Sequence, residues 1–281
     1  MKVVICAGTH GNERTGIWLL NKWQRHPELL PSGHQYKFLL ANPRATAANV
    51  RFVDSDLNRS FGPGGELATG YEAARSKEVR GDLVNWAQGE PYFLIDLHTT
   101  TTNMGATLVL SKNDYLSAHA VAKATEDMPS IRLLFNSDQD SDCRFVDSLA
   151  PHGVLVEMGP VAQGVEFSPI IDEMERVVLL LLEKLLLPVS GSKIELSGYL
   201  EHETVFYPTQ KEEKTARIHP SLWGQDYKEL KKGDPLFLNY EGQTIFYEGE
   251  SCFPVFIGES AYYWQNIAFL KSKPIRRSYL P

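Results

Sequence analysis

Cysteine is scarce in this chain of 281 residues, which has only Cys6, Cys143 and Cys252 and no CxxC pair. A disulfide framework would leave one thiol over, and widely spaced free thiols are typical of a reducing compartment. No secretory signal precedes the first apolar segment, so we expect a cytoplasmic protein. None of the three has a neighbouring base in the sequence, which argues against cysteine-based catalysis.

Long hydrophobic runs and excess positive charge are also lacking. The most apolar stretch, residues 177–187, contains Glu183 and Lys184 and is followed by Pro188, so it is too short to span a membrane. The net charge of -7 argues against a nucleic-acid partner. No Gly-x-Ser-x-Gly is present, and the glycine-rich residues 62–66 lack the lysine of a phosphate loop.

What the sequence does contain is an alternation of short apolar runs with helical patterns over residues 1–189. This alternation predicts an α/β fold with a mostly parallel mixed sheet flanked by helices. From residue 190 to 281 the pattern changes to short strands, with a tight hairpin at Glu241-Gly242, which predicts a smaller β-rich C-terminal domain. Predicted strands are 3–7, 36–41, 91–97, 106–110, 131–135, 154–156, 194–207, 235–240, 243–247 and 255–257, and predicted helices are 15–23, 71–88, 114–124 and 168–187.

Polar side chains follow the ends of two of these strands. His10 and Glu13 lie in the glycine-rich turn after the first strand, and His98 ends the strand at 91–97. Two close ligands and a distant third are typical of catalytic zinc, which leaves one position for water. Asp96 lies on the same strand face as His98 and could orient its ring. Hydrogen-bonded turn and strand-end residues without a metal are an equally good interpretation of the spacing.

Two further groups fit a hydrolytic site. Glu157 ends an apolar strand, where a desolvated carboxylate has a raised pKa and can act as a base; a surface salt bridge is the alternative. Arg51, Asn58 and Arg59 lie in a non-periodic polar loop, residues 42–65, and could clamp a carboxylate or an oxyanion. The alternative is a solvated surface. Residues 201–203, Glu-His-Glu, fall in an alternating strand pattern, and we expect them to face solvent.

Five motifs in order resemble the aspartoacylase and succinylglutamate desuccinylase family, and the match is closer to the aspartoacylase branch. The resemblance covers nearly the whole chain. The motifs are Gly8-Thr-His-Gly-Asn-Glu13, Asp56-Leu-Asn-Arg59, Asp96-Leu-His98, Glu157-Met-Gly-Pro160 and Glu259-Ser-Ala-Tyr-Tyr263.

This resemblance implies a zinc carboxypeptidase-like fold with a C-terminal β domain that caps the active site. It implies hydrolysis of the amide of an N-acyl amino acid such as N-acetylaspartate, with one zinc ion held by His10, Glu13 and His98. Glu157 would activate water, and Arg51 would polarise the scissile carbonyl. The family often forms dimers, so a homodimer is one expectation.

For substrate binding, the resemblance implies that Asn58 and Arg59 hold a carboxylate and that Tyr262, supported by Glu259, adds a hydroxyl. The sequence departs from the family at Thr99, where better-known members carry asparagine. It also departs before Glu157, where Arg144 is the nearest candidate for a further carboxylate-binding arginine. A desuccinylase and a zinc carboxypeptidase are the alternative enzymes, and a non-enzymatic metal-binding protein is the alternative without catalysis.

Overall fold

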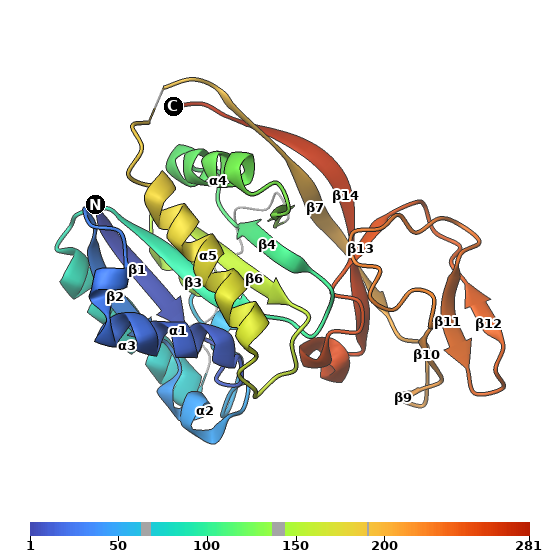
Figure 1. The fold of residues 1–281 in the computed structure, drawn as a ribbon. Helices are drawn as coiled ribbons and strands as arrows, with labels where there is room; N and C mark the ends of the chain where they lie inside the picture. The colour runs from blue at the N-terminus through green and yellow to red at the C-terminus, as the bar shows by residue number, and fades with distance from the viewer. Residues whose placement is uncertain (63–68, 137–143, 190) are drawn as a thin grey trace.

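A computed structural model describes residues 1–62, 69–136, 144–189 and 191–281. Its centre is a nine-stranded sheet with the strand order β13-β14-β7-β5-β4-β6-β3-β1-β2 (Figure 1). The strands of this sheet are β1 (Lys2–Ala7), β2 (Gln35–Leu40), β3 (Tyr92–Thr99), β4 (Gly105–Leu110), β5 (Arg132–Phe135), β6 (His152–Gly159), β7 (Ile194–Phe206), β13 (Phe253–Val255) and β14 (Ile267–Tyr279).

Most neighbouring strands of the first half of the chain run parallel, as the sequence predicts. The pairs β1–β2, β1–β3, β3–β6 and β4–β5 are parallel, and β4–β6 is the antiparallel exception. Every residue of β1 and β3 is buried, which explains their continuous apolar runs. The prediction of a mostly parallel mixed sheet is therefore confirmed.

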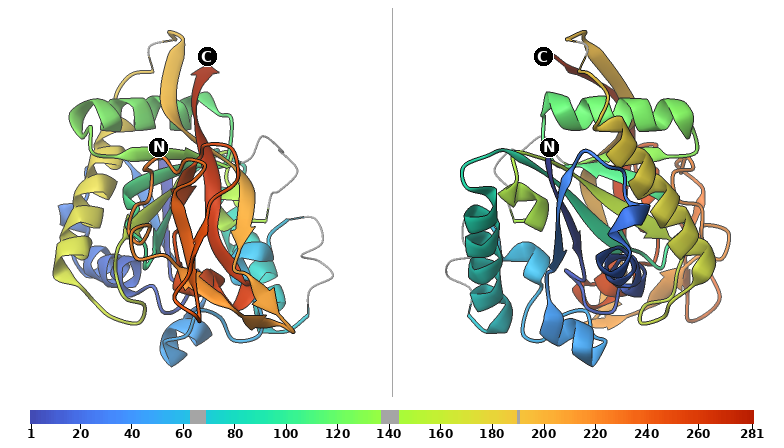
Figure 2. Two further views of the ribbon diagram at one scale, coloured as in Figure 1. Left: turned by 90° about the vertical axis from the view of Figure 1, so that its right-hand side faces the viewer. Right: turned by 60° about the vertical axis from the view of Figure 1, so that its left-hand side comes forward.

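Helices cover both faces of this sheet (Figure 2). One core cluster joins the apolar faces of α1, α4 and α5 to the sheet, and a second joins α3 to the opposite face. The helices are α1 (Arg14–Arg25), α2 (Pro43–Ala48), α3 (Tyr71–Ala87), α4 (Tyr115–Asp127) and α5 (Ser168–Lys184), with 3₁₀ turns η1 (Pro27–Leu29), η2 (Leu57–Arg59), η4 (Val146–Leu149) and η5 (Ser260–Gln265). Among the described residues, no helix is both long and apolar enough to cross a membrane.

The C-terminal segment contributes both to the central sheet and to a separate β arm. Strands β7 and β14 pair antiparallel along most of their length and extend the central sheet, and β5 joins β7 to it. The arm, which projects to the right in Figure 1, holds the three-stranded sheet β10 (Ala216–Ile218), β11 (Pro235–Asn239) and β12 (Thr244–Phe246) and the short pair β8 (Thr209–Gln210) and β9 (Glu213–Lys214). The β-rich character is confirmed, and the division at residue 190 stays a prediction.

Two local predictions need correction. The predicted strands do not include the long strand β14, which contains Pro274; this proline is tolerated where β13 no longer pairs with β14. The polar loop at 42–65 contains the short helix α2, capped by the Asn42 side chain. Cys6 and Cys252 are buried and unbonded, and Cys143 lies outside the described residues.

Candidate active site

The turn after β1 brings His10 and Glu13 to the carboxyl edge of the sheet. Gly11 within this turn packs directly against α2, where an added Cβ would lie 2.1 Å from the carbonyl carbon of Ala45. Its backbone N–H also donates to the Arg51 carbonyl at 3.1 Å. Only glycine fits so close to another backbone, so Gly11 lets the turn that carries His10 and Glu13 pack against α2.

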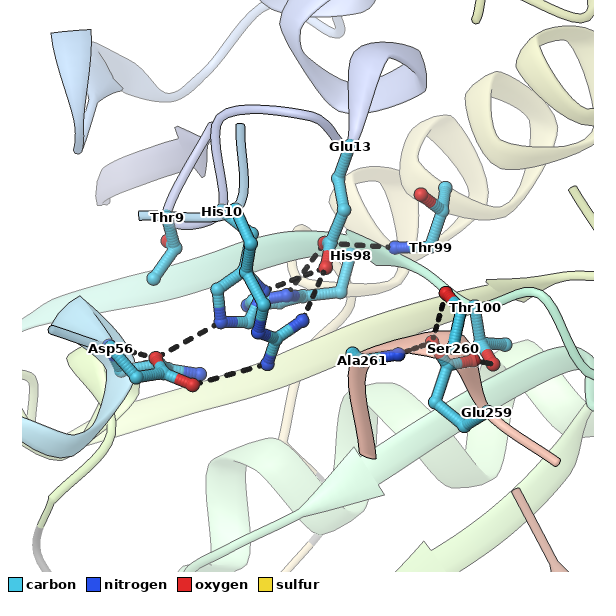
Figure 3. A network of polar contacts seen from close by, with 12 residues as sticks. Thr9, His10, Glu13, Asp56, His98, Thr99, Thr100, Glu259, Ser260 and Ala261 are labelled. Atoms are coloured by element: carbon cyan, nitrogen blue, oxygen red, sulfur yellow. Dashed lines mark hydrogen bonds and ion pairs between the residues drawn. The ribbon is translucent and has the colours of Figure 1, made fainter. Parts of the chain in front are cut away.

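Strand β3 lies beside β1 and delivers His98 to the same edge. Nδ1 of His10 lies 2.6 Å from Glu13 Oε1, and Nδ1 of His98 lies 2.8 Å from Glu13 Oε2. The three side chains are buried, and one ligand atom from each lies within 4.8 Å of the others. The sequence spacing alone could not decide whether His10, Glu13 and His98 lie together. In the structure these three side chains converge on one point (Figure 3).

A carboxylate stands behind each imidazole. His98 Nε2 donates to Asp96 at 2.6 Å, and His10 Nε2 donates to Asp56 at 3.1 Å. Both rings therefore direct Nδ1 toward Glu13, which is the arrangement that orients metal-binding histidines. The sequence singled out Asp96 but not Asp56, although Asp56 begins one of the five motifs.

The electrostatics of this cluster suit a cation. Burial would lower the pKa of His98, but Asp96 and Glu13 hold it well above its ordinary value. Burial would raise the pKa of Glu13, but His10 and His98 lower it below the ordinary range. The carboxylates that surround the two buried imidazoles suit a divalent metal ion, so the donor set fits zinc.

Glu157 lies next to this cluster, on the neighbouring strand β6. It is in register with His98 across the β3–β6 pair. Among the described residues its Oε1 is buried without a hydrogen-bond partner. Burial, and then the charge of Glu13, raise its pKa well above the ordinary value. A carboxylate of this kind can accept a proton at neutral pH.

The polar loop supplies cations to the same cavity. Arg51 donates to Glu13 at 3.4 Å and to Asp56 at 3.1 Å. Asn58 and Arg59 also line the cavity, in the 3₁₀ turn η2 that the Asp56 side chain caps. The Asn58 side-chain oxygen accepts from the Val146 backbone at 2.9 Å, which ties η2 to η4.

The C-terminal segment closes one side of the cavity through η5. Tyr262 lines the cavity and packs edge-on against Phe256, with 5.6 Å between the ring centroids. Glu259 caps η5 by accepting from the Ala261 backbone at 2.9 Å and also accepts from the Thr101 backbone at 2.8 Å (Figure 3). Glu259 thereby ties η5 to the segment that follows His98.

Arg144 is placed differently from the other predicted substrate-binding residues. Its side chain is exposed and is absent from the described lining of the cavity, although its carbonyl accepts from the Phe61 backbone at 3.2 Å. The next residue, Phe145, does line the cavity and lies under the Arg59 guanidinium, 5.0 Å from the ring centroid. A substrate contact by Arg144 stays a prediction.

The prediction for residues 201–203 is wrong at its first member. His202 and Glu203 are exposed, but Glu201 lines the cavity. In the β7–β14 pairing, Glu203 faces Lys271 and Glu201 faces Ser272, so His202 is an extra residue in a bulge. A bulge interrupts the alternation of side chains, and a simple strand pattern cannot reveal it.

Together, fold and site define an α/β protein with a buried His-Glu-His set at the edge of its sheet, an arrangement typical of metal-dependent hydrolases. Residues 1–185 match the succinylglutamate desuccinylase/aspartoacylase catalytic domain, and residues 195–274 match the AstE/AspA barrel-sandwich hybrid domain. A probable aspartoacylase of Acaryochloris marina is 37% identical over 95% of this chain and 94% of its own length. An N-acyl-aromatic-L-amino acid amidohydrolase (carboxylate-forming) of Mus musculus is 33% identical over 98% and 91%.

Solved structures agree with these matches. Murine aminoacylase 3 has a TM-score of 0.90 at 32% identity, covering 99% of this chain and 96% of that one. A succinylglutamate desuccinylase from Vibrio cholerae has a TM-score of 0.69 at 16% identity, covering 97% and 81%, and shares the fold. The chain belongs to the succinylglutamate desuccinylase/aspartoacylase family, and it is an amide-hydrolysing enzyme.

Proposed function

We propose that this enzyme hydrolyses the amide bond of an N-acyl amino acid in a zinc-dependent reaction, releasing a carboxylate such as acetate and a free amino acid. The single observation that carries the proposal is the convergence of His10, Glu13 and His98 beside Glu157, whose Oε1 is buried without a hydrogen-bond partner among the described residues. Family membership and the names of the relatives support the same reaction class.

In this proposal His10, Glu13 and His98 hold one zinc ion, and Asp56 and Asp96 orient the two rings. Zinc, when bound, supplies Lewis-acid activation of water and of the scissile carbonyl. Three protein ligands leave a position open, as catalytic sites require. The buried carboxylates around the rings favour a divalent cation over protons.

Glu157 acts as the general base and then as the general acid. It accepts a proton from water as the oxygen attacks the carbonyl carbon, and it passes that proton to the amide nitrogen as the C–N bond breaks. Its raised pKa and its position in register with His98 support this role. A carboxylate with a pKa nearer to neutrality can both accept a proton from water and donate it to the leaving nitrogen.

Arg51, Arg59, Asn58 and Tyr262 bind the substrate. Arg51 is next to Glu13, so its guanidinium can stabilise the charge that develops on the carbonyl oxygen. Arg59 makes no ion pair within the described residues and can take the α-carboxylate, helped by the Asn58 amide. The Tyr262 hydroxyl adds a hydrogen bond. These contacts would hold the amide against the base.

Two classes of amino-acid side chain are candidates. The sequence predicts a substrate like N-acetylaspartate, in line with the name of the Acaryochloris marina relative. The name of the mouse relative points to aromatic side chains, and apolar lining residues of the cavity favour this class. These apolar residues are Val109, Leu134, Leu155, Phe256, Ile267 and Leu270.

The test is release of free amino acid from a panel of compounds by protein stripped with a chelator and then reloaded with zinc. The panel contains N-acetylaspartate, N-acetylglutamate, N-acetylphenylalanine, N-succinylglutamate and dipeptides. We expect hydrolysis of N-acetyl amino acids that disappears on stripping and returns with zinc. Preference for N-succinylglutamate would favour a desuccinylase, and preference for dipeptides a carboxypeptidase.

No release from any compound by the reloaded protein would refute the proposal. A homodimer and a cytoplasmic location stay predictions, and light scattering of the purified protein tests the first.

A further inference from the structure

The cavity carries more negative than positive side chains. It has a volume of about 250 Å³ and is lined by four glutamates and two arginines. Glu13 belongs to the metal set, Glu157 is the base, and Glu259 is occupied by backbone and threonine donors. The fourth, Glu201, has no part in the reaction as described above.

The cations are less available than their number suggests. Arg51 already contacts two carboxylates, those of Glu13 and Asp56. Arg59 is therefore the arginine of the cavity that is left to meet a substrate carboxylate. Every amino-acid substrate brings one α-carboxylate, and that single charge matches Arg59. A second carboxylate would find no further arginine among the described lining residues.

Glu201 lies where it can act on that second charge. The bulge in β7 turns it into the cavity, where Arg59, Tyr262 and Thr204 are also lining residues. Burial raises its pKa, and the charge of Arg59 partly lowers it again. Tyr262 in turn interacts electrostatically with both Arg59 and Glu201. Glu201 thus lines the same cavity as the arginine that would hold the α-carboxylate, and its side chain makes no hydrogen bond among the described residues.

We propose that Glu201 sets the substrate preference of this cavity: its carboxylate disfavours N-acyl amino acids with an acidic side chain and leaves those with an apolar or aromatic side chain. This inference rests on the proposed function. A like charge in a poorly solvated cavity repels strongly, because the field is screened less than in water. The apolar wall formed by Val109, Leu134, Leu155, Phe256, Ile267 and Leu270 provides the complementary surface.

The experiment compares kcat/KM for N-acetylphenylalanine and N-acetylaspartate in zinc-loaded wild type, Glu201→Gln and Glu203→Gln. Glutamine keeps the size of the side chain and removes the charge. Glu203 is the matched control, because it is on the same strand, carries the same charge and is exposed. We expect wild type to prefer N-acetylphenylalanine. Glu201→Gln should shift the ratio of the two values toward N-acetylaspartate by roughly tenfold or more, and Glu203→Gln should leave the ratio unchanged.

A second measurement separates this inference from the proposed function. Kd for both compounds is measured by calorimetry on Glu157→Gln protein, with and without the Glu201→Gln change, so that turnover is not needed. The ratio of the two Kd values should shift in the same direction. A wild-type preference for N-acetylaspartate, an unchanged ratio in Glu201→Gln, or an equal shift in Glu203→Gln would overturn the role of Glu201. Absence of hydrolysis with a shifted Kd ratio would overturn the proposed reaction and keep the binding role.

Discussion

Two sets of histidine and glutamate side chains occur in this molecule, and the fold treats them in opposite ways. The N-terminal set, His10, Glu13 and His98, is scattered along the sequence but converges within 4.8 Å. The C-terminal set, residues 201–203, is consecutive but diverges: Glu201 enters the cavity, while its two neighbours face solvent. Nearness in sequence is therefore a poor guide to a metal site.

The difference follows from the strands that carry the residues. The N-terminal set lies at the ends of parallel neighbours β1 and β3, which meet at one edge of the sheet. The C-terminal set lies along β7, where the bulge at His202 separates Glu201, which lines the cavity, from Glu203, which is exposed. The pKa directions differ accordingly. The histidines lower the pKa of Glu13 although burial opposes this, whereas burial raises the pKa of Glu201.

The largest expected effect is a loss of zinc and activity on replacing a histidine of the N-terminal set, compared with replacing the histidine of the C-terminal set. His98→Ala removes one of the three buried side chains proposed to hold zinc, so we expect the purified protein to lose its zinc and its activity to fall by roughly 10³-fold or more. His202→Ala removes an exposed histidine and should leave both unchanged. Metal analysis by mass spectrometry and amino-acid release check the pair. Full zinc occupancy in His98→Ala would reject the assigned metal set.

The next effect separates the base from the metal. Glu157→Gln cannot accept a proton, so turnover should fall by roughly 10²-fold or more while zinc content stays that of wild type. The shape is nearly conserved and the carboxylate has no hydrogen bond to lose at Oε1. Single-turnover assays on zinc-loaded protein measure the effect. Near-normal turnover in this variant would assign the proton transfer to another group.

The sequence predicts the position of a site residue well when it ends a buried parallel strand, and poorly when it lies in an irregular loop or a bulged strand. That His10, Glu13 and His98 lie at one edge of the sheet could be predicted, because buried parallel strands are continuous apolar runs and the residues at their ends share an edge. Asp56 was missed because it lies in an irregular loop, where no periodicity indicates which carboxylate turns toward His10. Glu201 was misplaced because a bulge depends on the pairing partner β14, whose own pattern is obscured by Pro274.

A smaller effect tests the carboxylate behind the metal set. Asp96→Asn keeps the side-chain shape but weakens its hold on His98 Nε2, so we expect zinc affinity to fall by roughly 10- to 100-fold. Competition with a chromogenic chelator measures it. Asp114→Asn is the matched control, because Asp114 contacts His152 at 2.9 Å in a comparable pair away from the described metal set. Equal losses of zinc affinity in both variants would show a general effect of unfolding.

The smallest expected effect concerns stability and sharpens the contrast between Glu201 and Glu203. Because the pKa of Glu201 is raised in the folded state, the folded protein holds this proton more tightly than the unfolded chain does. The contribution of this proton to the free energy of unfolding is complete below the ordinary glutamate pKa of about 4.3. It is lost as the pH rises through the raised pKa of Glu201 in the folded protein. Relative to wild type, Glu201→Gln should therefore gain stability between about pH 4 and pH 7.

Urea unfolding of metal-free protein at both pH values measures this gain, since metal release then makes no contribution. Glu203→Gln instead loses an exposed ion pair with Lys271, 3.0 Å long, so its change should be a loss of at most about 1 kcal/mol at pH 7. Opposite signs for two neutralised glutamates on one strand would follow directly from burial of the first and exposure of the second. A loss of stability in Glu201→Gln at pH 7 relative to pH 4 would mean that its charge is well compensated in the cavity, which would also weaken the case for repulsion of acidic substrates.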